Sequence, residues 1–550
     1  MRKTLSLTSL ALAAVLLAGC TSAEPEPPVR AMRTALPEAP LTVVADPDAV
    51  AGALAASRAL FTEAPVVVTA SADDADAQLT AASAAVALGA PLLLTGDGVA
   101  GELRRLGVAA VLDVGGSDPL AGAAAPTDGE DAPVVVSVDA SPDALSAVLP
   151  GEPPVTRLPR DSSAVSAVAA LDPAEPALLT VGSDRSSESG GDTDAGSLPR
   201  TRPAAPLDGG MVVATDEPTQ LAAVATARAA GLPVEILPPD GADPRSAPAL
   251  VAALRDAAPR TVLAVGAPFA AVPSLGWKIR TAISGVELPG GGQTLFPGKR
   301  FVALYGAPDA PVLGVLGEQG IPETIERAET TAAPYRELTD DTVVPMLEII
   351  ATVAAGSAGS DGDYSNELPV ETLRPWVEAA GEAGMYVVLD LQPGRSDFLS
   401  QARQYQELLE LPYVGLALDP EWRLAPGQVH LKQIGSVGVE EVNGVGAWLA
   451  DLTAENGLPQ KMFVLHQFQT RMIANRAALD TSRQELAYLI HVDGQGGQPA
   501  KQDTWRTLHQ GVPAGVAWGW KNFYDEDLPP LTPEQTMTEV QPTPELVTYQ

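Results

Sequence analysis

The sequence has one cysteine, little positive charge and no long apolar run after its first twenty residues. A single cysteine in 550 residues excludes any internal disulfide, so the hydrophobic cores alone must stabilise the fold. Thirty-four Lys and Arg residues against 69 Asp and Glu residues give a net charge of −35, which repels nucleic acid. No Gly-rich phosphate loop follows a predicted strand, and no Gly-x-Ser-x-Gly elbow is present. We therefore expect neither a nucleic-acid-binding protein nor a phosphate-loop or serine-elbow enzyme.

The first twenty residues have the order of a secretory signal. Arg2 and Lys3 precede an apolar run over residues 10–17, which is shorter than the roughly 20 residues that a membrane-spanning helix needs. The run leads into Leu17-Ala18-Gly19-Cys20, which resembles the lipobox of bacterial lipoproteins. The resemblance implies that residues 1–19 are a signal peptide and that Cys20 carries the lipid. We expect attachment to the extracytoplasmic face of the cell membrane through this anchor.

Changes in composition divide the rest of the chain into four parts. The predicted parts are a stiff, Pro-rich tether over residues 20–40, two α/β regions over residues 41–150 and 151–288, and a last domain over residues 299–550. Residues 183–206 predict a disordered insert in the second α/β region. All four histidines and six of the seven tryptophans lie after Pro289-Gly290-Gly291-Gly292, so the composition changes at this break.

Short apolar runs alternate with Ala-rich helical stretches in the N-terminal half. Residues 66–69 and 92–95 lack polar alternation, as buried strands of a parallel sheet do, and residues 77–88 between them suit a crossover helix. Similar units recur more loosely up to residue 266. The pattern predicts an α/β fold with parallel sheets.

One of these units carries a family resemblance. Its residues are Val66-Val67-Val68-Thr69-Ala70-Ser71, Asp76-Ala77, the stretch 81–95 and Val114-Gly115-Gly116. They resemble the cell-wall-binding repeat 2 family, whose tandem repeats hold surface proteins non-covalently to anionic wall polymers. The match covers residues 41–117 and decays over residues 133–285, where later units lack the motif. The resemblance implies the repeat fold, and it leaves both a scaffold role and wall-polymer binding open.

Apolar strands and long helical stretches alternate over the last domain. About 250 residues with this rhythm predict a (β/α)₈ barrel of the TIM type. Helices are predicted over residues 370–383, 396–409 and 440–455. Seven strands are predicted over residues 301–306, 343–350, 385–391, 414–419, 462–468, 486–492 and 516–520, and residues 545–550 are the candidate for the eighth.

Polar and aromatic residues gather at the ends of these strands. In such barrels the active site lies at the carboxyl ends of the strands, and buried carboxylates are rare unless they are paired. The catalytic candidates are Glu421, Asp419, Asp390 and Asp493. The substrate-binding candidates are Trp518, Trp520, His491, His466, Glu348 and Gln467.

The most informative segment is the run YVGLALDPEW over residues 413–422. If the strand continues past Pro420, Asp419 and Glu421 lie two residues apart and face the same side. Adjacent carboxylates push their pKa values apart, as glycoside hydrolysis requires. The segment resembles strand four of family 18 chitinases, whose motif ends in Asp-x-Glu and an aromatic residue, and family 25 lysozymes share a comparable Asp-x-Glu. The first two aspartates of the chitinase motif are absent here.

These observations predict a lipid-anchored envelope protein that recognises and hydrolyses an envelope or extracellular glycan. Glu421 is the expected acid and Asp419 its partner. Trp518 and Trp520 resemble the last chitinase strand, where a tryptophan forms the floor of the sugar site. The alternative is a non-catalytic lipoprotein that binds a glycan or wall polymer with an inactive barrel. No cofactor is expected. A metal site is an alternative that could be formed by His466, His491, Asp390 and Asp419 from separate strands, but it is not favoured because the histidines lack a local two-His spacing.

Overall fold

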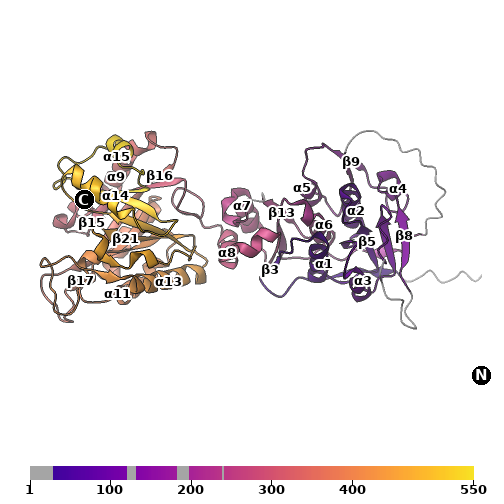
Figure 1. Ribbon diagram of the computed structural model, residues 1–550, viewed down its shortest axis with the longest axis horizontal. Helices are drawn as coiled ribbons and strands as arrows, with labels where there is room; N and C mark the ends of the chain where they lie inside the picture. The colour runs from indigo at the N-terminus through magenta and orange to yellow at the C-terminus, as the bar shows by residue number, and fades with distance from the viewer. Residues whose placement is uncertain (1–28, 121–131, 182–196, 238–240) are drawn as a thin grey trace, which may run out of the picture.

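The computed structural model describes residues 29–120, 132–181, 197–237 and 241–550 (Figure 1). Its N-terminal half contains two four-stranded parallel sheets, as the apolar runs predict. The first sheet has the order β6 (Leu92–Leu94), β5 (Val66–Ala70), β7 (Ala110–Val114) and β8 (Val134–Val138). The second has the order β13 (Val234–Leu237), β12 (Gly210–Thr215), β14 (Thr261–Val265) and β3 (Leu41–Val44).

Ala-rich helices fill the space between the two sheets. Helix α2 (Ala75–Leu88) begins where the Asp74 side chain accepts a hydrogen bond from Ala77 N, and it ends at Gly89, whose φ of 62° suits a residue without a side chain. Small side chains let α6 (Leu221–Ala229) approach both α2 and α1 (Ala49–Leu60), and one hydrophobic core joins these helices to both sheets. The remaining helices are α3 (Val99–Leu106), α4 (Pro142–Ser146), α5 (Ala164–Ala169), α7 (Pro248–Ala257) and α8 (Leu275–Ser284).

Two features of this half differ from the sequence predictions. Strand β3 begins the first predicted region but pairs with β14 of the second, so the second sheet draws on both regions. Residues 30–34 fall in the predicted tether yet form β1 (Arg30–Ala31) and β2 (Arg33–Thr34), which pair with β11 (Thr201–Arg202) and β4 (Phe61–Glu63). Met32 is buried between them, and this contact holds the segment on the domain. The signal peptide, Cys20, residues 21–28 and residues 183–196 of the predicted insert lie outside the described residues.

The C-terminal half is a closed barrel of eight parallel strands, as predicted. Strand β25 (Leu546–Tyr549) closes it against β15 (Lys299–Gly306) and supplies the eighth strand inside the range 545–550. The others are β16 (Thr342–Ala354), β18 (Tyr386–Leu391), β19 (Val414–Leu418), β21 (Lys461–Gln467), β23 (Leu486–Val492) and β24 (Ala517–Asn522). The surrounding helices are α9 (Ile321–Ala332), α10 (Val370–Glu382), α11 (Phe398–Gln404), α12 (Gln406–Leu409), α13 (Val439–Glu455), α14 (Gln498–Leu508) and α15 (Pro533–Glu539).

The interior of the barrel changes character along its axis. Towards the amino ends of the strands the interior is an apolar core to which all eight strands contribute. Leu288 and Leu295 join this core from the segment before β15. Because side chains alternate along a strand, the residues two positions further on also face inward. These residues are polar at the carboxyl ends of several strands, where the candidate site lies.

Helix α8 joins the two halves at the opposite end of the barrel (Figure 1). Trp277 Nε1 donates to the carbonyl oxygen of Leu458 at 2.9 Å, just before β21. Lys278 Nζ donates to Gln484 Oε1 at 2.7 Å, just before β23. Trp277 and Lys278 are both buried, so the junction is a packed contact. Within the described part of the chain, no helix combines the length and the apolar character needed to cross a membrane.

Candidate active site at the carboxyl end of the barrel

Inward-facing polar side chains from seven strands meet at the carboxyl end of the barrel. Glu348, Asp390, His466 and His491 have no exposed surface, although each is a group that water solvates strongly. The contributing residues are Tyr305 on β15, Glu348 on β16, Asp390 on β18, His466 on β21, His491 on β23, Lys521 on β24 and Thr548 on β25. The structure thus brings together six predicted site residues, because Asp493 follows β23 directly and contacts His466, and the buried Asp419 has an atom within 4.8 Å of both.

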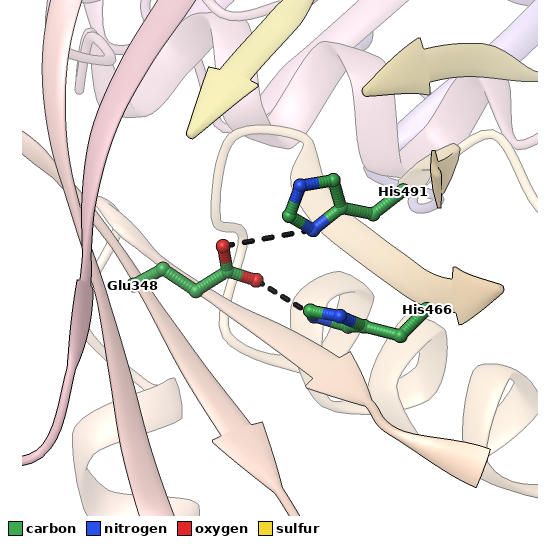
Figure 2. Close-up of side chains that lie close together, drawn as sticks. All are labelled: Glu348, His466 and His491. Carbon is green, nitrogen blue, oxygen red and sulfur yellow. Dashed lines mark hydrogen bonds and ion pairs between the residues drawn. The ribbon is translucent and has the colours of Figure 1, made fainter. Parts of the chain in front are cut away.

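His466 lies at the centre of the cluster. Its Nδ1 is 2.9 Å from Asp493 Oδ2, and its Nε2 is 2.9 Å from Glu348 Oε1. The neighbouring His491 places Nε2 at 2.8 Å from Thr548 Oγ1 and Nδ1 at 3.7 Å from Glu348 Oε2. Figure 2 shows both oxygens of Glu348 facing the two imidazole rings. Glu348 therefore links two histidines from neighbouring strands.

A second group of contacts surrounds Tyr305. Its hydroxyl donates to Asp390 Oδ2 at 2.9 Å, and Lys521 Nζ lies 3.4 Å from the centre of its ring. Lys521 is buried and supplies positive charge among the carboxylates. Sequence reasoning missed Tyr305 and Lys521. Lys521 could have been found by extending the predicted strand by one residue, because it faces the same side as Gly519.

The expectation that Asp419 and Glu421 share one pleated strand is wrong. Strand β19 ends at Leu418, and Pro420–Trp422 form a 3₁₀ turn in which the Asp419 side chain accepts from Glu421 N at 3.1 Å. Pro420 fixes its φ and has no N–H to donate to the sheet, so the strand stops there. Glu421 is still close enough to the cluster to respond to the charge of Asp493.

The carboxyl groups of the cluster differ in their affinity for protons. Burial and the negative charge of Asp493 raise the pKa of Glu421 to about 7. Burial likewise raises the pKa of Asp390 to about 6 and the pKa of Asp419 well above its usual value. Burial also disfavours the charged form of Asp493, but its hydrogen bond with His466 outweighs this effect and lowers the pKa. Protonated and ionised carboxyl groups therefore coexist near neutral pH, as general acid–base chemistry requires.

The pKa values of the two histidines are shifted in opposite directions. Burial disfavours the imidazolium form of both. For His466 the carboxylates of Asp390 and Glu348 outweigh burial and raise its pKa well above the usual value. For His491 burial prevails and its pKa is lowered. Burial alone would raise the pKa of Glu348, but His491 and His466 lower it, so this carboxylate is ionised.

Three predicted substrate-binding residues lie on the outer side of the barrel wall. Trp520 is fully buried with its ring 5.6 Å from that of Trp505, and Trp518 stacks on His509 at 3.6 Å. Gln467 accepts a hydrogen bond from Arg476 Nη1 at 2.6 Å. The reason is alternation along the strands, which turns Ala517, Gly519 and Lys521 inward on β24 and His466 inward on β21. The structure does not bring these three residues to the carboxylates.

Gly519 has a specific role in the packing of this site. A Cβ atom built at this position would lie 2.9 Å from His491 Cδ2, closer than such contacts normally come. The missing side chain thus makes room for the His491 ring inside the barrel. The glycine on β24 therefore allows the His491 ring on the neighbouring β23 to face the interior.

Several polar atoms of the cluster lack a hydrogen bond. Among the described residues, Glu348 Oε2, Asp390 Oδ1, His491 Nδ1 and Asp493 Oδ1 are buried without a hydrogen bond. Nearly all buried polar atoms in native proteins are hydrogen-bonded, so four such atoms in one cluster call for an explanation. A site that takes up a polar or charged ligand provides one.

Comparison with known proteins identifies no family for the chain. No family model matches it, and no curated relative matches it. Among solved structures it is similar to Cwp6 from Clostridium difficile, with 14% identity and a TM-score of 0.34, over 58% of this chain and 64% of that chain. Cwp8 from the same organism is similar over 45% of this chain and 52% of that chain, with 14% identity and a TM-score of 0.31. The chain thus spans less than two thirds of the length of either protein.

A glycoside hydrolase family 6 enzyme, CcCel6C from Coprinopsis cinerea, is also similar. The identity is 13% and the TM-score is 0.19, over 40% of this chain and 60% of that chain. Likenesses at this level carry no conclusion about the activity of this chain. The function has to be argued from the site.

Proposed function

We propose that this protein is a lipid-anchored envelope protein whose barrel hydrolyses an envelope or extracellular glycan. The observation that carries the proposal is the opposite direction of the pKa shifts of Glu421 and Asp493. The pKa of Glu421 is raised to about 7, partly by the charge of Asp493, whose own pKa is lowered. Glycoside hydrolysis uses such a pair, one carboxyl group to donate a proton and one ionised carboxylate.

In the proposed reaction Glu421 protonates the oxygen of the glycosidic bond as that bond breaks. Asp493, held ionised by His466, stabilises the positive charge that develops on the sugar. A water molecule then adds to the anomeric carbon and gives its proton to the ionised Glu421, which restores the acid. Asp419 positions Glu421, because its Oδ1 accepts the hydrogen bond from the Glu421 N–H at 3.1 Å. Lys521 lies nearby and lowers the pKa of Asp493, so it helps to keep this carboxylate charged.

The N-terminal features fit a protein that works among wall polymers. The lipobox-like Leu17-Ala18-Gly19-Cys20 would keep the chain at the outer face of the membrane. The stretch that resembles cell-wall-binding repeats would hold or orient the barrel next to its substrate. Both features support an envelope location, and neither specifies the glycan.

The test is cleavage of a panel of wall glycans, chitin oligomers and other polysaccharides by the full-length chain in detergent. Glu421→Gln keeps the shape of the side chain but cannot deliver a proton, so turnover should fall by roughly 10²-fold or more while glycan binding persists. Glu526→Gln, at an exposed position in the loop after β24, is the matched control and should leave turnover unchanged. Equal turnover by Glu421→Gln and wild type would refute the proposal.

Burial of the cluster favours a second candidate, a glycan-binding protein without catalysis. Glu348, Asp390 and His466 have no exposed surface, so a substrate could reach them only if the surrounding loops moved. Binding of a glycan with no cleavage by the wild type would support this candidate and exclude the hydrolase.

A further inference from the structure

We propose that the carboxyl end of the barrel binds a divalent transition-metal ion through Glu348, His466 and His491. This inference goes beyond the proposed glycan hydrolysis and does not depend on it. The three residues come from β16, β21 and β23, and one ligand atom from each lies within 4.8 Å of the others. Figure 2 shows their side chains converging on one point inside the barrel.

The orientation of the two imidazoles supports the assignment. Each ring turns one nitrogen towards Glu348, His466 through Nε2 at 2.9 Å and His491 through Nδ1 at 3.7 Å. The opposite nitrogen of each ring is held by another side chain, His466 Nδ1 by Asp493 and His491 Nε2 by Thr548. Metal-binding histidines are typically oriented in this way, because a second partner fixes the ring and its tautomer.

The buried atoms without a hydrogen bond are a second observation. Glu348 Oε2 and His491 Nδ1 face each other, are buried, and have no hydrogen bond among the described residues. Both side chains have no surface exposed to solvent. A cation bound between them would accept electron pairs from both atoms. A bound cation would explain why Glu348 Oε2 and His491 Nδ1 lie 3.7 Å apart, too far for a hydrogen bond.

The donor set indicates the class of metal. Two imidazoles and one carboxylate form the ligand set of catalytic zinc sites, which leave a fourth position for water, and the same set binds other divalent transition metals. Carboxylate-only sites suit calcium or magnesium instead. The sequence placed all three residues at strand ends but did not identify them as one ligand set, because they are 118 and 25 residues apart and show no local spacing.

A second set of ligand atoms competes for the assignment. Asp419, His466 and Asp493 also have atoms within 4.8 Å of one another. We assign the metal to Glu348, His466 and His491, because this set offers two imidazoles and the second set offers only one. Replacement of Asp419 separates the two assignments.

The test is calorimetric titration of the full-length chain with ZnCl₂, after chelator treatment and dialysis. We expect one equivalent of Zn²⁺ to bind and the melting temperature to rise, because the ion binds only the folded chain. His491→Ala and Glu348→Gln should each abolish the stoichiometric site. Thr548→Val keeps all three ligands and removes only the partner of His491, so zinc affinity should fall about 10- to 100-fold.

Two control variants accompany these changes. His430→Ala removes a histidine on the long loop after β19, whose Nε2 contacts Tyr364 O at 2.9 Å, and zinc binding should persist. Asp419→Asn should also preserve it. Circular dichroism of every variant without zinc establishes whether the fold is retained. If His491→Ala is unfolded, the zinc affinity of folded Thr548→Val is compared with that of the wild type instead.

Three outcomes would overturn the proposal. These are no stoichiometric zinc site in the wild type, unchanged zinc affinity in folded Glu348→Gln, or loss of the site in Asp419→Asn but not in Glu348→Gln. The zinc measurements use no glycan. A failure of the metal assignment is therefore distinguishable from a failure of the proposed hydrolysis, which the turnover of Glu421→Gln decides.

Discussion

Replacement of Trp520 by Ala tests which face of β24 the indole occupies. The ring is fully buried, lies 5.6 Å from the Trp505 ring at an angle of 74°, and has Lys501 Nζ 4.8 Å from its centre. Its Nε1 donates to Asn522 Oδ1 at 2.9 Å. These contacts are typical of a core residue. We therefore expect Trp520→Ala to act on the stability of the barrel.

The size of the effect follows from these contacts. Removal of a buried Trp or Phe side chain costs about 3–5 kcal/mol. The edge-to-face aromatic pair contributes about 0.5–1.5 kcal/mol and the hydrogen bond about 1 kcal/mol of that total. The free energy of unfolding should thus fall by about 3–5 kcal/mol. A urea titration followed by circular dichroism measures this loss.

The matched control is Trp422→Ala, which removes a half-exposed indole beside Glu421. The Trp422 ring lies 5.3 Å from that of His430 on the same loop. We expect a smaller loss of stability than for Trp520→Ala and a larger loss of glycan affinity. A Trp520→Ala protein with unchanged stability and weakened glycan binding would show that the Trp520 indole is exposed, and it would refute the outward orientation.

Three other predictions concern the anchor, the junction and a buried lysine. Cys20→Ala should release the protein from membranes, and its retention in washed membranes would reveal another anchor. Cleavage after Gly285 should yield two pieces that each unfold cooperatively in urea, because Leu288 and Leu295 stay with the barrel core; non-cooperative unfolding of both would contradict this. Burial lowers the pKa of Lys461 from 10.5 to about 7. Between pH 7 and 10.5 the lysine is therefore protonated in the unfolded chain and neutral in the folded chain. The free energy of unfolding should then rise with pH by about 1.4 kcal/mol per pH unit. Lys461→Met should remove that slope in urea titrations from pH 7 to 10, and an unchanged slope would count against a buried amine.

The barrel could be predicted from the sequence because its strands are continuous apolar runs. Such runs identify buried parallel strands without any knowledge of their partners, and polar residues at their carboxyl ends mark the site. Glu348, Asp390, His466 and His491 were found in this way. The pairing of β3 with β14 was missed, because it joins the two α/β regions that the change in composition separates.

The orientation of individual side chains was harder to predict. On β24 a shift of one residue decides whether Trp518 and Trp520 or Gly519 and Lys521 face the interior, and an apolar run does not specify that choice. A glycine beside a bulky imidazole and a lysine among carboxylates are signals that only the three-dimensional packing makes visible. Pro420 was a signal in the sequence itself, because proline rarely continues a central strand.

The pH dependence of glycan turnover tests the central claim most directly. If Glu421 is the proton donor, turnover should fall as the pH rises through about 7, since the acid loses its proton there. Turnover should persist at mildly acidic pH, because the lowered pKa of Asp493 keeps this carboxylate ionised. The decline near pH 7 should be missing from the residual activity of Glu421→Gln. A turnover that rises through pH 7, or the same decline in Glu421→Gln, would contradict the account.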